Sequence, residues 1–204
     1  MALAYRQGNL HPMSRELNIQ VPPGVKVPPR HPDAPASGKL LGSHNPDCYG
    51  CGPNHPAGLH LVAYAQESMS ITAQFTVTDL HQGAPGLAHG GLLSCAFDEA
   101  LGKLMWLVRE PAVTGKLETS FLAPVPVGSI LFINAEITGQ DGRKIYTRAE
   151  GRIGSDSGVL AVEAAAIFII VPMEHFIKHA SAEFKQVFRD RRDLSIDTEF
   201  EINP

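Results

Sequence analysis

Residues 91–108 constrain the fold of this chain most, because they are apolar at nearly every position. A helix that is apolar on all sides needs cover all round, unlike a surface helix with one apolar stripe. We therefore expect a buried helix over 91–108. Runs with β-type composition lie on both sides of it, at 59–65, 69–77, 113–122, 129–138, 143–153 and 159–171. This order predicts an α+β fold in which an antiparallel sheet wraps around one central helix.

The rest of the 204-residue chain divides into two flanking regions. Residues 1–43 form a proline-rich N-terminal arm, and 44–172 form the central domain. Proline excludes helix interiors and central strands, so the arm is either extended over the domain or a partner subunit, or a disordered tail. Residues 173–204 predict a C-terminal amphipathic helix and tail, from apolar side chains at helical spacing: Phe176, Ile177, Ala180, Phe184, Val187 and Phe188.

The start of the central helix carries a second signal. A loop rich in Gly and Pro leads into His89-Gly90-Gly91, and Asp98 follows at the ninth position after the histidine. Amides at a helix start donate to anions, which makes the N–H of Gly91 a candidate oxyanion donor, with Gly90 allowing the turn. Asp98 is then a candidate general base, because partial burial raises the pKa of a carboxylate. The alternative is a core carboxylate hydrogen-bonded to a backbone group.

This run resembles the hotdog-fold acyl-CoA thioesterases, in the branch related to phenylacetate-pathway thioesterases. The shared features are Gly-Ala-Pro-Gly at 83–86, then His-Gly-Gly, six residues, Asp-Glu, and Gly102 four residues after the Asp. The resemblance extends from about residue 48 to 171. It implies a hotdog fold, hydrolysis of acyl-CoA thioesters within fatty acid metabolism, and a homodimer or a dimer of dimers. It implies no cofactor, since CoA is part of the substrate.

The resemblance also implies roles for individual residues. Asp98 would activate water or act as a nucleophile that forms an anhydride, and Thr114 would orient the water. His89 would be a second base, or would shape the loop and donate a hydrogen bond near the thioester oxygen; a purely structural role is the alternative. Glu99 competes with Asp98, but its position four residues before Lys103 favours an exposed ion pair.

Contacts to CoA are expected from a second group of residues. Arg143 and Lys144 follow the turn at 141–142, with Arg148 further along, and the family binds nucleotide phosphates in this region. Ser120 and Leu122 stand where some relatives contact the pantetheine or nucleotide, although Leu122 departs from the basic residue of certain members. A basic hairpin that is merely solvated is the alternative.

The spacing of the helix residues predicts an active site made by two chains. Gly91 and Asp98 are seven residues apart, which is about 10.5 Å along a helix axis. One substrate carbonyl cannot lie within about 3 Å of both groups. Two antiparallel helices from a pair of subunits would bring the start of one beside Asp98 of the other.

Composition limits the alternatives. A formal net charge of −4 gives no electrostatic footprint for nucleic acid or an anionic membrane, and we expect a cytoplasmic protein without a membrane partner.

Cys48-x2-Cys51, flanked by His44 and His55, has a spacing found in zinc sites. A single Cys pair in Gly/Pro-rich packing, of a sort that the family has without metal, argues against this, so no metal is expected. A non-catalytic acyl-CoA-binding or sensing protein is the alternative function.

Overall fold

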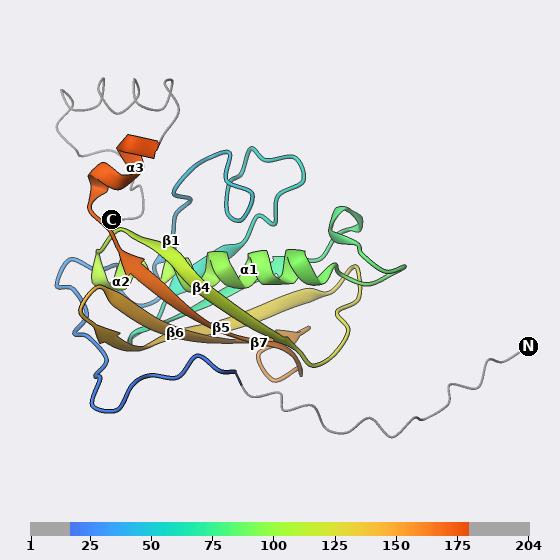
Figure 1. The fold of residues 1–204 in the computed structure, drawn as a ribbon. Coiled ribbons are helices and arrows are strands. Elements are labelled where there is room, and N and C mark those ends of the chain that lie inside the picture. The colour runs from blue at the N-terminus through green and yellow to red at the C-terminus, as the bar shows by residue number, and fades with distance from the viewer. Residues whose placement is uncertain (1–16, 180–204) are drawn as a thin grey trace, which may run out of the picture.

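The computed structural model describes residues 17–179 as a curved antiparallel sheet with a helix lying in its concave side (Figure 1). Seven strands form one sheet in the order β1-β2-β3-β5-β6-β7-β4. Their bounds are β1 Leu40–Leu41, β2 Val62–Ala65, β3 Ser70–Thr76, β4 Ala112–Phe121, β5 Ile130–Asp141, β6 Lys144–Ile153 and β7 Val159–Ile170. The predicted order of two strands, a helix and four strands is therefore correct, with the two-residue β1 as an addition.

The central helix is divided into two parts. Helix α1 covers Gly90–Lys103 and helix α2 covers Met105–Val108, so the predicted single helix over 91–108 was wrong in its continuity. The amide of Leu104 bonds to the carbonyl of Leu101, which tightens the last turn of α1 and interrupts the regular ladder. Arg109 then ends α2 in a left-handed conformation, with a φ of 54°.

The core lies between the sheet and these helices. Side chains from α1, including Phe97 and Leu101, are fully buried against inward-facing residues of the strands. Strand β5 shows the alternation that such packing requires, with buried and exposed residues taking turns along most of its length. The glycine at 151 on β6 makes room for the ring of Phe97, because a Cβ there would lie 2.6 Å from it.

The part of the arm that the structure describes runs along the other side of the sheet (Figure 1). Leu17 and Ile19 are buried there against Tyr146 and Ala165, in a cluster separate from the main core. The remainder of the arm, residues 1–16, lies outside the described residues. So does most of the predicted C-terminal helix, of which α3, Met173–His179, is described. Within residues 17–179 no helix has the length and apolar character needed to cross a bilayer.

Candidate functional site

Helix α1 begins at a histidine cap. His89 is the N-cap residue, and its Nδ1 accepts a hydrogen bond of 2.9 Å from the amide of Gly91. A ring nitrogen that accepts a hydrogen bond carries no proton, so the proton of the neutral imidazole is on Nε2. The Gly91 amide, which was predicted to stabilise the oxyanion, therefore donates its hydrogen bond to His89 instead. The Nε2–H of His89, which is an exposed residue, is free to act as a hydrogen-bond donor to a ligand.

Asp98 is joined to strand β4 by Thr114. The Oγ1 of Thr114 donates a hydrogen bond of 2.7 Å to Oδ1 of Asp98. A β-bulge between Thr114 and Lys116 makes this contact possible. Because the bulge adds one residue, Thr114 faces α1 as Leu117 does, although the two are three positions apart. Gly115 forms the bulge, and a Cβ there would lie 2.8 Å from Ile169.

The buried carboxylate of α1 is Glu99 and not Asp98. Asp98 is half-buried, whereas the side chain of Glu99 is 11% exposed and that of Lys103 is 2% exposed. The predicted pair between Glu99 and Lys103 exists, with 3.3 Å between Nζ and Oε1, but its expected exposure was wrong. The loop of residues 42–52 folds over this face of α1, and Lys103 donates to the carbonyl of Gly42 at 2.6 Å. Burial raises the pKa of Glu99, which Lys103 opposes.

An apolar pocket of about 320 Å³ opens beside the start of α1. It is lined by residues of the loop before α1, by the first turns of α1 and by the end of β4 with the segment after it: Ala84, Leu87, Ala88, Gly90, Leu93 and 121–125. Gly90 lies close to the ring of Phe121, since a Cβ there would lie 3.5 Å from it. Phe121 itself is 50% exposed. The pocket thus lies at the start of α1, whereas Asp98 is near the middle of the helix.

The residues predicted to contact CoA fall in two places. Arg143 and Lys144 are exposed at the β5–β6 turn, at the same end of the sheet as Thr114, because Lys144 pairs with Ile169 and Ile169 with Val113. Arg148 is on the face turned away from α1, where its guanidinium donates to Gln20 at 3.3 Å.

Ser120 belongs to the same outer face as Arg148. Its neighbour Thr119 bonds to Ser94 of α1 at 3.0 Å, and strand residues alternate between faces. Within one chain, Arg148 and Ser120 therefore do not converge with Asp98.

A further cluster joins the loop before β2 to α1. His44, Cys48, Cys51 and Glu99 bring one possible ligand atom each to within 4.8 Å of the others. His55, the other histidine flanking the Cys pair, is not in this group; its ring packs edge-on against Tyr49 at 4.9 Å.

Comparison with known proteins agrees with the fold and the motif. Residues 85–159 match the family model described as "Thioesterase superfamily". Acyl-coenzyme A thioesterase THEM4 of Xenopus laevis is 31% identical over 88 residues, which are 43% of this chain and 39% of the relative. The chain aligns with about two fifths of the length of that relative.

Solved structures of this superfamily share the fold. A crystal structure of a thioesterase superfamily protein superposes with a TM-score of 0.57 at 25% identity, covering 67% of this chain and 70% of the other. The structure of smu.793 from Streptococcus mutans UA159, bound to acetyl CoA, has a TM-score of 0.50 at 16% identity, covering 53% of this chain and 86% of the other. At that identity the likeness concerns the fold alone.

The sequence predicted that Asp98 and Thr114 act together, but it did not predict two features of the candidate site. Phe121 beside Gly90 had no signal of its own, because its proximity depends on how β4 crosses the helix start. The cluster around Glu99 had a partial signal in the Cys-x2-Cys spacing with His44 beside it, but Glu99 joins it only through tertiary packing.

Proposed function

We propose that this protein hydrolyses acyl-CoA thioesters to a free acid and CoA. The observation that carries the proposal is the hydrogen bond between Thr114 and Asp98, which holds a half-buried carboxylate on the helix that begins with the His-Gly-Gly motif. The names of the aligned relatives point to the same reaction.

In the proposed reaction Asp98 is the general base. With Oδ1 held by Thr114, Oδ2 takes a proton from water as the water oxygen attacks the thioester carbonyl carbon. The C–S bond then breaks, and the CoA thiolate leaves and receives a proton. Attack by Asp98 itself, giving an anhydride that water opens, is the second route to the same products. Neither route needs a cofactor besides the CoA of the substrate.

The start of α1 is proposed to stabilise the oxyanion. Negative charge on the carbonyl oxygen is favoured at a helix N-terminus. Since the amide of Gly91 already bonds to His89 Nδ1, two arrangements serve. Either Gly91 shares its proton between His89 and the oxyanion, or Nε2–H of His89 donates to the oxyanion in its place.

The apolar pocket beside the helix start is proposed to receive the acyl or pantetheine part of the substrate. Its lining from Leu87, Leu93, Phe121 and Val125 is apolar, so it favours carbon chains over charged groups. The exposed Arg143 and Lys144 are proposed to meet CoA phosphates. Arg148 and Ser120 lie on the outer face of the sheet, so any contact that they make with CoA is proposed to occur on that face.

We further propose that two chains share each site, through β4. Among residues 17–179 this strand is last in the sheet order and pairs with β7 alone, so within this part of the chain its other edge is open to pairing. Thr114 near one end of β4 contacts Asp98, and Phe121 at the other end lies by Gly90, about 23 Å away along a strand. If the β4 strands of two chains paired antiparallel and crossed near Leu117, Thr114 of one chain would lie opposite Phe121 of its partner. Asp98 of the first chain would then lie near the helix start of the second chain.

A panel of acyl-CoA esters, followed by release of free thiol, tests the function. Hydrolysis of at least one class, lost in Asp98→Asn, is expected. Saturable binding of acyl-CoA without thiol release from any ester would favour the alternative, a non-catalytic acyl-CoA-binding or sensing protein.

A further inference from the structure

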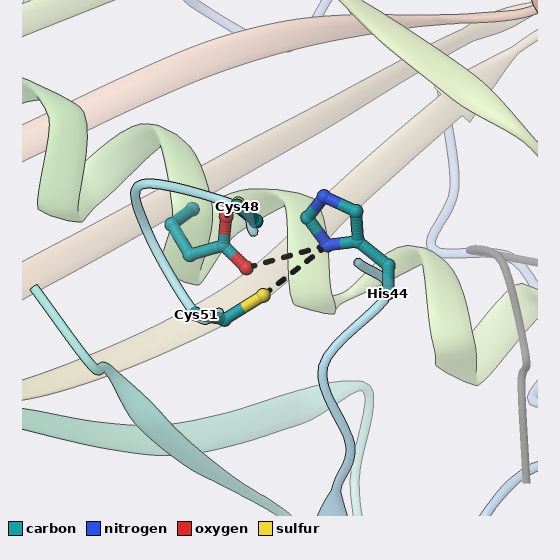
Figure 2. Close-up of side chains that lie close together, drawn as sticks. His44, Cys48 and Cys51 are labelled. Atoms are coloured by element: carbon teal, nitrogen blue, oxygen red, sulfur yellow. Dashed lines mark hydrogen bonds and ion pairs between the residues drawn. The ribbon is translucent and has the colours of Figure 1, made fainter. Parts of the chain in front are cut away.

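The cluster of His44, Cys48, Cys51 and Glu99 plays no part in the proposed hydrolysis. Three of its members come from the loop before β2, and Glu99 comes from α1, next to Asp98. Figure 2 shows the imidazole of His44 facing both the Cys51 sulfur and a carboxylate oxygen. Side chains from four different positions thus converge on one small volume.

Three separations between the polar atoms match the edges of a tetrahedral metal site. Cys51 Sγ lies 3.3 Å from His44 Nδ1, and Cys48 Sγ lies 3.5 Å from Glu99 Oε2. Glu99 Oε1 lies 3.7 Å from His44 Nδ1. Zinc bonds of about 2.0–2.3 Å to nitrogen, oxygen and sulfur correspond to ligand–ligand edges of about 3.3–3.8 Å. These three separations fall in this range, and one ligand atom from each of the four residues lies within 4.8 Å of the others, so a Zn²⁺ ion would draw the more distant side chains inward by about 1 Å.

The backbone next to Cys48 can support a thiolate there. The amide of Gly50 donates to Cys48 Sγ at 3.3 Å. Gly50 has to be glycine for the carboxylate to reach the site, because a Cβ there would lie 2.4 Å from Glu99 Oε2.

The charges around the cluster balance with a divalent cation. Two thiolates, one carboxylate and a neutral imidazole carry three negative charges, and Zn²⁺ reduces this to one. The ammonium group of Lys103, buried 3.3 Å from Glu99, supplies the remaining positive charge. A buried set of charges is least costly when it is neutral overall.

We propose that His44, Cys48, Cys51 and Glu99 bind a structural Zn²⁺ ion that fastens the loop before β2 to helix α1. Four protein ligands close the coordination sphere, which is typical of structural zinc and leaves no position for substrate. The ion would fix the turn of α1 that also carries Asp98, so it stabilises the helix on which the proposed base is mounted. The role is independent of whether the protein hydrolyses thioesters.

The test is metal binding by the full-length chain, purified under reducing conditions. We expect one zinc per chain by elemental analysis, and competition against a chromogenic chelator to give its affinity. In a protein loaded with Co²⁺, the visible absorption of a tetrahedral site and a sulfur-to-cobalt charge-transfer band are expected. Metal should also raise the thermal midpoint of unfolding, because binding free energy adds to folding free energy.

Variants assign the ligands. Cys48→Ser and Cys51→Ser should each weaken the charge-transfer band, and the double variant should lose it. Each single change should weaken zinc affinity by more than the about 10–100-fold that loss of a hydrogen bond to a ligand costs. Cys95→Ser is the matched control, since the half-buried Cys95 on α1 is outside the cluster; it should bind zinc as the unaltered protein does.

Two results on the unaltered protein overturn the proposal, whether or not the variants fold. One is the absence of stoichiometric Zn²⁺ or Co²⁺ binding by the reduced chain. The other is a Co²⁺ spectrum without sulfur ligation. Among the variants, a spectrum that Cys95→Ser changes as strongly as Cys51→Ser does would also overturn it. A Cys48–Cys51 disulfide that forms in air, in a chain that binds no metal after reduction, would assign the pair to redox chemistry instead.

Discussion

Thr114 Oγ1 donates a 2.7 Å hydrogen bond to Asp98 Oδ1, and thereby ties edge strand β4 to helix α1 at the carboxylate proposed as the base. The contact depends on the bulge at Gly115, which turns Thr114 toward the helix. Bulges of this kind often re-aim a side chain beside an active site. Asp98 is thus oriented from a second element of the fold, and its two oxygens take different roles in the proposed mechanism.

Asp98→Asn is expected to keep the fold and to lower kcat for thioester hydrolysis by about 10²–10⁴-fold, the usual share of general-base catalysis. The amide has nearly the volume of the carboxyl group but cannot take the proton of water. Steady-state kinetics with the best ester of the panel measure this, and circular dichroism checks the fold. Glu110→Gln, at an exposed position of the chain, is the control. Activity within threefold of the unaltered protein would remove Asp98 from the role of base.

Thr114→Val is expected to lower kcat by about tenfold with little change in KM, because the lost hydrogen bond orients Asp98 and does not hold CoA. Thr114→Ser keeps the hydroxyl and should restore most of the rate. This pair of variants separates positioning from packing, since Val is the closer match to Thr in shape. If Ser is as slow as Val, the hydroxyl is not what Thr114 contributes.

Periodicity was sufficient to predict the order of strands and helix along the chain and the burial of the helix. The strands at 113–122 and 143–153 agree with β4 and β6 to within a residue at each end, because alternation and turn residues are local signals. The break at Leu104 was not predictable, since it depends on one tightened hydrogen bond and leaves the apolar pattern unchanged.

The site was predictable only where the motif itself carries the chemistry. Asp98, Thr114 and the helix start follow from the spacing of the run and its family resemblance. The burial of Glu99 does not, because the loop of 42–52 that covers it is distant in the sequence. The hydrogen bond from Gly91 to His89 was equally hidden, since sequence does not reveal which rotamer a cap residue adopts.

Lys103→Met is expected to destabilise the protein by about 3–5 kcal/mol, the usual cost of removing one partner of a buried ion pair. Glu99 would lose the ammonium group that offsets its burial beneath the loop of 42–52, and the bond from Lys103 to the carbonyl of Gly42 would also be lost. Denaturant unfolding measures the difference. Lys39→Met, at an exposed position, should change stability by less than about 0.5 kcal/mol. Equal effects of the two changes would mean that the pair contributes nothing specific.

Docking of the arm on the sheet is expected to weaken in acid through Glu118. Asn18 donates to this carboxylate at 2.6 Å and the amide of Ile19 at 2.8 Å, and these bonds lower the pKa of Glu118 below its ordinary 4.5. A lowered pKa contributes stability above the ordinary value and loses it as pH falls through the lowered value. Hydrogen exchange at Ile19 should therefore be faster in Glu118→Gln at pH 7, with the difference from the unaltered protein disappearing in acid. Protection that is the same in both proteins at pH 7 would contradict this.

The shared site is expected to show itself by complementation between two inactive variants. Asp98→Asn removes the base, and Gly91→Leu crowds the helix start, where even a Cβ would lie 3.1 Å from His89 Nδ1. If the base of one chain serves the helix start of the other, a mixed dimer has one doubly altered site and one intact site. Subunit exchange should then restore up to about half the activity of an equivalent dimer of unaltered chains. Mixed dimers verified by native mass spectrometry that show no recovery would mean that base and oxyanion donor come from one chain. A stable monomer with full activity would exclude the pairing of β4 strands altogether.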